Sequence, residues 1–114
     1  RDAGLVEKLL AAGAVILGKL AVAEFGLDTA PSPTRNPWQV GHDAGGGAGA
    51  AVAACLCFGA VATDSGGGLR LAAANCGVTG LKPSFGHIAR HGVLPLAATL
   101  DHVGALARSA DDVA

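Results

Sequence analysis

The sequence predicts an α/β fold, and two local patterns carry that prediction. In each, a helical pattern runs directly into a short apolar run of the kind that forms buried strands: residues 3–13 lead into 14–17, and the alanine-rich residues 49–57 lead into 59–63. A helix followed at once by such a strand is typical of α/β domains. The composition agrees, since 51% hydrophobic and 15% charged residues suit a packed sheet rather than a disordered segment.

The first half of the chain is predicted to hold one helix, one strand and a long loop. The apolar positions of residues 3–13 repeat at helical spacing: Leu5, Val6, Leu9 and Leu10. Gly13 ends this pattern, and the apolar residues 14–17 then form a strand covered on both faces. Residues 26–46 are rich in proline and glycine and are predicted to be a loop.

The second half is predicted to alternate helices with extended segments. Residues 49–57 form a helix of small side chains that packs closely on a sheet, and residues 59–63 form a second buried strand. A short helix follows near 69–75, then extended segments around 77–82 and 101–107. Ser109 is the expected N-cap of a last helix, with Asp112 three residues further on.

Charge and composition argue against several kinds of partner. The net charge is −1, and no run of lysines or arginines indicates nucleic-acid binding. No apolar run approaches the ~18 residues of a membrane span. The three cysteines and four histidines lack the spacing of a metal site, so neither a metal nor a cofactor is expected. Free thiols and a helix-like start without signal-peptide features predict a cytoplasmic protein.

One glycine motif suggests a nucleotide-binding alternative. Residues 45–50 satisfy G-x-G-x-x-A, and Asp64 ends an apolar strand 19 residues after Gly45. Such a glycine loop must leave an apolar strand, whereas residues 36–43 are polar and interrupted by proline. The dinucleotide interpretation therefore stays a secondary hypothesis.

Two other motifs carry a family resemblance. The run D-S-G-G-G-L-R at 64–70 and the run C-G-V-T-G-L-K-P-S-F-G at 76–86 closely resemble the core of the amidase signature family. Further matching segments occur in the family's order: residues 11–19, 24–25, 34–38, 90–96, 100–104 and 107–109. This resemblance implies hydrolysis, or ammonia-releasing transfer, at the C–N bond of a small-molecule carboxamide. It also implies a mixed central sheet flanked by helices.

The resemblance implies a Ser–cis-Ser–Lys triad, and this chain departs from it at every member. The nucleophile position is Gly68, which has no side chain to form an acyl-enzyme. The middle serine falls on Gly47 when counted from Trp38, or on Ala44 when counted back from Val52. The family's lysine belongs to an upstream V-K-D segment that has no match here. No catalytic residue is predicted to be retained, and the chain is predicted to be inactive, with an active amidase in intact form as the alternative.

The resemblance leaves a backbone site in place. In the family, successive N–H groups of the loop hold the developing oxyanion. Here four residues supply them: Ser65, Gly66, Gly67 and Gly68. Asp64 and Arg70 are expected to brace this loop, and the Ser65 hydroxyl is expected to bond nearby backbone.

Family members are several times longer than 114 residues, so residues 1–114 are predicted to be one partial amidase signature domain. It would lack the upstream lysine segment and the C-terminal part. Strands that are apolar on both faces need neighbours at both edges. Self-association through exposed sheet edges is therefore expected.

Overall fold

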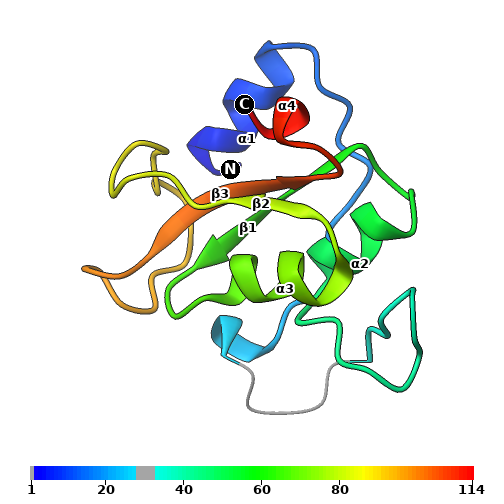
Figure 1. Ribbon diagram of the computed structural model, residues 1–114. Helices are drawn as coiled ribbons and strands as arrows, with labels where there is room; N and C mark the ends of the chain where they lie inside the picture. The colour runs from blue at the N-terminus through cyan, green and yellow to red at the C-terminus, as the bar shows by residue number, and fades with distance from the viewer. Residues whose placement is uncertain (1, 28–32) are drawn as a thin grey trace.

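The computed structural model describes residues 2–27 and 33–114 and has a small sheet with helices on both sides (Figure 1). The described strands are β1 (Gly59–Asp64), β2 (Thr79–Leu81) and β3 (His102–Ala107). β3 lies between the other two and is antiparallel to both, which gives the order β1-β3-β2. The predicted α/β class, with helices flanking a sheet, is confirmed.

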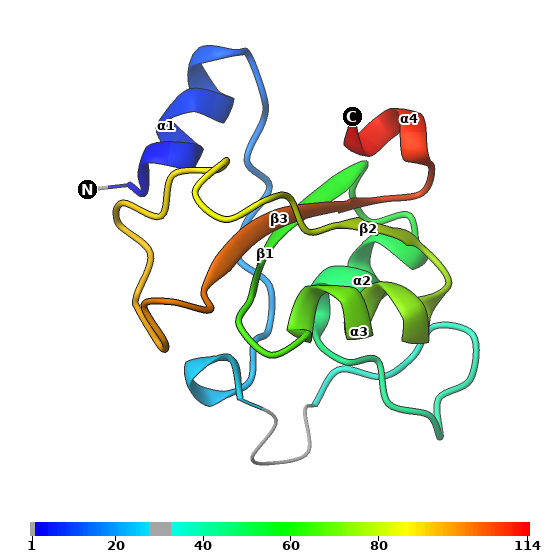
Figure 2. The same cartoon turned by 60° about the vertical axis from the view of Figure 1, so that its left-hand side comes forward.

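The helices form two groups on opposite sides of the sheet. α2 (Gly47–Ala53) and α3 (Gly68–Cys76) pack against each other and against β1, whereas α1 (Gly4–Ala11) and α4 (Ala110–Val113) lie on the other side (Figure 2). A 3-10 turn, η1 (Glu24–Gly26), follows the long extended segment after α1. Ser109 is the N-cap of α4 as predicted, because its Oγ accepts a hydrogen bond of 3.2 Å from the Asp112 N–H.

The connection of the strands brings two distant loops together. β1, α3 and β2 form a βαβ unit whose two strands are separated by β3, a split arrangement. The antiparallel register of β1 with β3 sets Asp64 opposite His102 and Gly59 opposite Ala107. The loop that leaves β1 therefore starts beside the chain that enters β3.

The core is built mainly from small side chains. Leu69, Leu106 and Val52 are fully buried, and the rest of the main cluster is alanine: Ala48, Ala60, Ala72 and Ala73. Small residues let the two inner helices approach closely, because a Cβ built on Gly49 would lie 2.3 Å from the Ala72 carbonyl oxygen. The alanine and glycine content of this segment thus reflects close packing.

Several sequence predictions are confirmed with shifted ends. The helices expected at 3–13, 49–57 and 69–75 are α1, α2 and α3, and the extended segments expected at 59–63, 77–82 and 101–107 contain β1, β2 and β3. α2 ends early because the chain turns there, with Cys55 at a φ of 58°. The predicted loop 26–46 has only an isolated bridge between Arg35 and Asp43 among its described residues, and 28–32 lie outside them.

The strand predicted at 14–17 is wrong. The segment pairs with no described strand, and Val15 and Leu17 are 81% and 72% exposed. An apolar run supplies side chains for burial but not the neighbouring backbone that a strand needs. The prediction that 59–63 is buried on both faces is also wrong, because Ala60 and Asp64 point inward while Val61 and Thr63 are exposed.

We expect Gly49→Ala to destabilise the protein, although alanine is the better helix former by about 1 kcal/mol. The added Cβ has no room against Ala72, and overpacking of this kind costs about 1–3 kcal/mol. Urea unfolding at a fixed protein concentration, followed by circular dichroism, measures the difference. Gly41→Ala is the control, since a Cβ there meets nothing within 4 Å. A Gly49→Ala midpoint at or above that of the parent chain would contradict the close approach of α2 and α3.

Candidate functional site at the glycine loop

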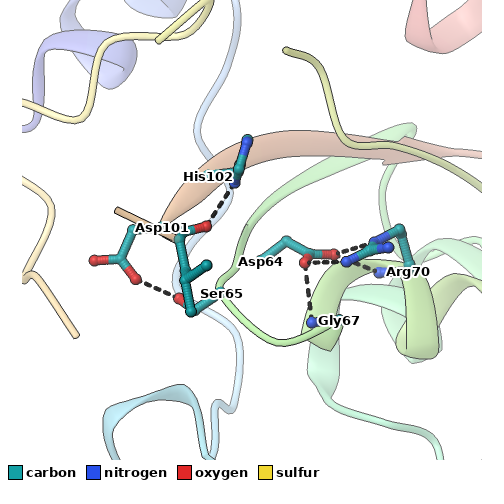
Figure 3. A network of polar contacts seen from close by, with 7 residues as sticks. Asp64, Ser65, Gly67, Arg70, Asp101 and His102 are labelled. Atoms are coloured by element: carbon teal, nitrogen blue, oxygen red, sulfur yellow. Dashed lines mark hydrogen bonds and ion pairs between the residues drawn. The ribbon is translucent and has the colours of Figure 1, made fainter. Parts of the chain in front are cut away.

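A buried carboxylate holds the loop between β1 and α3. Asp64, 1% exposed, ends β1 and accepts four hydrogen bonds (Figure 3). Its Oδ1 takes the Gly67 N–H at 3.0 Å and Arg70 Nη2 at 2.9 Å, and its Oδ2 takes Arg70 Nε at 2.9 Å and the Arg70 N–H at 3.2 Å. The two-pronged ion pair and the two backbone bonds fix both the start of α3 and the turn before it.

These contacts control the charge of the pair. Burial raises the pKa of Asp64, but the hydrogen bonds and positive charge of Arg70, with the Gly67 N–H, outweigh it and hold the pKa below its ordinary value. The Asp64 carboxylate in turn raises the pKa of Arg70. Both groups therefore stay ionised at neutral pH.

A second carboxylate ties the loop to the segment before β3. The Ser65 hydroxyl donates to Asp101 Oδ1, and Figure 3 shows it on the opposite side of the loop from Arg70. Asp101 also accepts the N–H groups of Leu96 at 2.9 Å and Ala97 at 3.0 Å. The expectation that Ser65 bonds nearby backbone is wrong, because the register of β1 with β3 brings a stronger, charged acceptor within reach.

The Ser65 contact affects the ionisation of its acceptor. The hydrogen bond from Ser65 lowers the pKa of Asp101, burial raises it, and the N–H groups of Ala97 and Leu96 and the charge of Arg90 lower it further. The net direction is downward, so Asp101 is also ionised at neutral pH. Ser65 is thus held as a hydrogen-bond donor to an anion.

The remaining backbone donors of the loop are open. The Gly67 N–H is used by Asp64, whereas within the described chain no acceptor takes the N–H of Gly66 or Gly68. A Cβ built on Gly66 or Gly67 meets nothing within 4 Å, so nothing crowds the loop on that side. Gly67 has a φ of 118°, a conformation that favours glycine. Two N–H groups on either side of a fixed turn form a small site for a carbonyl oxygen or an anion.

This site opens on a cavity of about 620 Å³. Gly66, Gly67 and Gly68 line it together with Gly47, Thr63 and mostly aliphatic side chains. Thr63 supplies a hydroxyl that the sequence analysis missed; its place next to Asp64, on the outward face of an alternating strand, is the signal that pointed to it. Arg70 is the one ionisable side chain among the described lining residues.

The triad positions suggested by the resemblance lie in different surroundings. Gly68 is the first residue of α3, and a Cβ built there would touch only the Thr63 carbonyl oxygen, at 3.6 Å. Gly47 also lines the cavity, but its Cβ would lie 2.7 Å from the Ala21 carbonyl oxygen. Ala44 is fully buried, away from the lining residues, with its carbonyl oxygen 3.4 Å from Cys76 Sγ. Position 68 thus has room for a side chain, whereas position 47 does not.

The glycines of the G-x-G-x-x-A motif serve packing. In the described chain before Gly45 there is no strand, only the isolated bridge at Arg35. Gly47 lies against the extended segment at Ala21, and Gly49 lies against α3. The feature that a dinucleotide-binding loop requires, a preceding strand, is missing from the described residues.

No group of three or more metal-ligating side chains gathers within residues 2–27 and 33–114. Over the same residues, none of the helices is both long and apolar enough to cross a membrane.

Comparison with known proteins identifies the family. The family model described as Amidase matches residues 1–114, so the chain belongs to the amidase family. The putative amidase AmiD of Mycobacterium tuberculosis is 49% identical over 120 aligned positions, covering 99% of this chain and 25% of that protein. The A-type component of the glutamyl-tRNA(Gln) amidotransferase of Solidesulfovibrio magneticus is 46% identical over 121 positions, covering 99% and 25%.

Solved structures give the same result. The native peptide amidase of Stenotrophomonas maltophilia matches with a TM-score of 0.91 and 38% identity, over 99% of this chain and 26% of that one. The chain therefore spans about a quarter of the length of the relatives it matches. The alignments with the curated relatives are also longer than 114 residues, so those proteins contain residues within this region that have no counterpart here.

We expect the stability of the protein to fall in acid because of Asp64 and Asp101. Their folded pKa values lie below the unfolded value of about 3.9. Their contribution is therefore complete above that pH and is lost as the pH falls through the lowered folded values. Asp64→Asn should lose about 1–3 kcal/mol at pH 7 and show a weaker acid dependence.

Urea unfolding at several pH values between 7 and 2 tests this expectation. Asp111→Asn is the matched control, because that carboxylate is exposed on α4 and should change stability by less than about 1 kcal/mol. The interpretation of the Asp64–Arg70 pair would be wrong if the two variants had the same stability at pH 7 and the same acid profile.

Proposed function

We propose that this chain carries the carbonyl-binding loop of an amidase without the nucleophile, and that it hydrolyses no carboxamide by itself. The observation that carries the proposal is the open pair of Gly66 and Gly68 N–H groups beside a cavity, with no side chain at position 68. On this view Ser65, Gly66, Gly67 and Gly68 are what remains of the oxyanion loop, and Asp64 and Arg70 are its support.

The chemistry of the family indicates what such a site does. Amide hydrolysis through an acyl-enzyme needs a nucleophile, a base that takes its proton, and donors for the oxyanion. Backbone donors alone polarise a carbonyl oxygen or hold a carboxylate, but they break no bond. We therefore expect binding of a small carboxamide or carboxylate, without turnover.

The two hydroxyls near the loop are poor substitutes for the missing serine. Ser65 already donates to Asp101 and lies outside the lining of the cavity. Thr63 lies in the lining, but the one ionisable side chain among the described lining residues is Arg70, which stays protonated and cannot act as a base. A hydroxyl without a base is a weak nucleophile at neutral pH.

The activity of a longer protein is a separate proposal. Because the relatives are about four times as long, an intact form that contains a lysine segment and a complete site remains the alternative to an inactive family member. We propose that residues 1–114 are part of one such domain. The three cysteines are free, which supports a reducing compartment such as the cytoplasm.

We also propose that the chain as it stands associates with itself. β1 and β2 are the edges of the sheet, with no further described strand beside them. Exposed aliphatic side chains lie on both edges, with Val61 at 41% and Leu81 at 44% exposure. Open edges with apolar side chains favour pairing between chains.

We expect the chain to release no ammonia from aliphatic or aryl carboxamides above the buffer rate. Gly68→Ser should fold, since position 68 has room for a Cβ, but it should stay inactive and unlabelled by a fluorophosphonate serine probe for want of a base. Ammonia release and probe labelling measure these outcomes. Turnover that is abolished by Ser65→Ala or Thr63→Val would overturn the proposal and identify that hydroxyl as the nucleophile.

We expect the average mass in sedimentation velocity to rise above 11.0 kDa as the concentration increases. Val61→Lys should reduce this rise, because a charge on β1 disfavours edge pairing. Leu94→Lys is the control, as Leu94 is exposed in a loop far from the strand edges in sequence. A monodisperse 11.0 kDa species at every concentration would show that the edges are closed in solution.

A further inference from the structure

The walls of the cavity are made of aliphatic side chains that solvent still reaches. Six large apolar residues that are more than a third exposed line it together: Leu20, Val22, Leu27, Val61, Leu71 and Leu96. They come from the segment after α1, from β1, from α3 and from the loop before β3. Contiguous apolar surface gathered from separate segments is typical of a binding site.

The cavity offers no free charge to a ligand. Arg70 is the one ionisable side chain among its described lining residues, and both Nε and Nη2 of its guanidinium already bond Asp64. A charged group placed among the aliphatic walls would lose its hydration without gaining a partner. The lining therefore selects against a charged acyl group.

The polar groups of the cavity suit the head of a carboxamide or carboxylate. The Gly66 and Gly68 N–H groups are open donors, and the Thr63 hydroxyl lies in the same lining. A cavity of about 620 Å³ is also large for a head group alone.

We infer that this cavity binds the uncharged, apolar acyl part of a carboxamide or carboxylate whose head is held by the Gly66 and Gly68 N–H groups. The inference rests on the proposed function and adds the class of acyl group. Aliphatic chains of several carbons fit it, and acyl groups with a second carboxylate or an ammonium group do not.

Binding of three carboxylates tests this inference: acetate, hexanoate and adipate. Equilibrium dialysis of the radiolabelled acids at low protein concentration gives the affinities, and amide shifts of Gly66 and Gly68 give the location. A fully buried methylene strengthens binding by about fourfold, so the four extra methylenes of hexanoate, partly covered, should give at least about tenfold over acetate. Adipate has the same six carbons and a second charge, and it should bind at least about tenfold more weakly than hexanoate.

Two matched variants test the walls. Leu71 in α3 and Leu10 in α1 are helical leucines of similar exposure, 46% and 47%, but only Leu71 is in the cavity lining. Leu71→Gln should weaken hexanoate binding by about threefold or more and leave acetate unchanged, whereas Leu10→Gln should change neither. Leu96→Gln, in a loop, repeats the test if Leu71→Gln disturbs α3.

The possible results separate the two proposals. Equal affinity for acetate and hexanoate, or for hexanoate and adipate, would overturn the inference about the acyl group while leaving the carbonyl-binding loop in place. Equal loss of hexanoate binding in the Leu71 and Leu10 variants would also overturn it. If no acid shifts the amides of Gly66 and Gly68, the proposed function itself fails.

Discussion

The loop that defines this structure depends on one buried carboxylate. Asp64 ends β1 and receives four hydrogen bonds from Gly67 and Arg70. An unpaired carboxylate at 1% exposure would be costly, so these bonds are strongly favoured and set the path of the turn. Because the Gly67 N–H is consumed there, the donors left open are those of Gly66 and Gly68. The Ser65–Asp101 bond then secures the other side of the loop.

The fold of the loop and the chemistry of its family are carried by different residues. Asp64 and Arg70 hold the turn, and close backbone packing at Gly49 and Gly104 holds the helices and strands around it. Position 68, where the resemblance places a nucleophile, makes no side-chain contact that this packing needs. A serine hydroxyl can therefore be absent from this position while the surrounding geometry still matches a peptide amidase at a TM-score of 0.91.

The cavity beside the loop results from how the N-terminal half is arranged. Residues 14–23 run as an exposed extended segment, and their last part borders the cavity opposite β1 and α3. Small residues on α2 and α3 leave room that large side chains would fill, and the aliphatic side chains around the rim stay exposed. An apolar surface of this kind is stable in water only at a cost, which favours a ligand or further protein covering it.

The sequence by itself determined the family, the order of elements from 47 onward and the loss of the nucleophile, because motifs, periodicity and side-chain chemistry are local. It did not determine that 14–17 is exposed and unpaired, since a strand needs a backbone partner that no local pattern describes. It also missed the Ser65–Asp101 bond and the Thr63 hydroxyl in the cavity. Those depend on the antiparallel register that sets Asp64 opposite His102, and only the tertiary structure decides which residues so far apart in the chain meet.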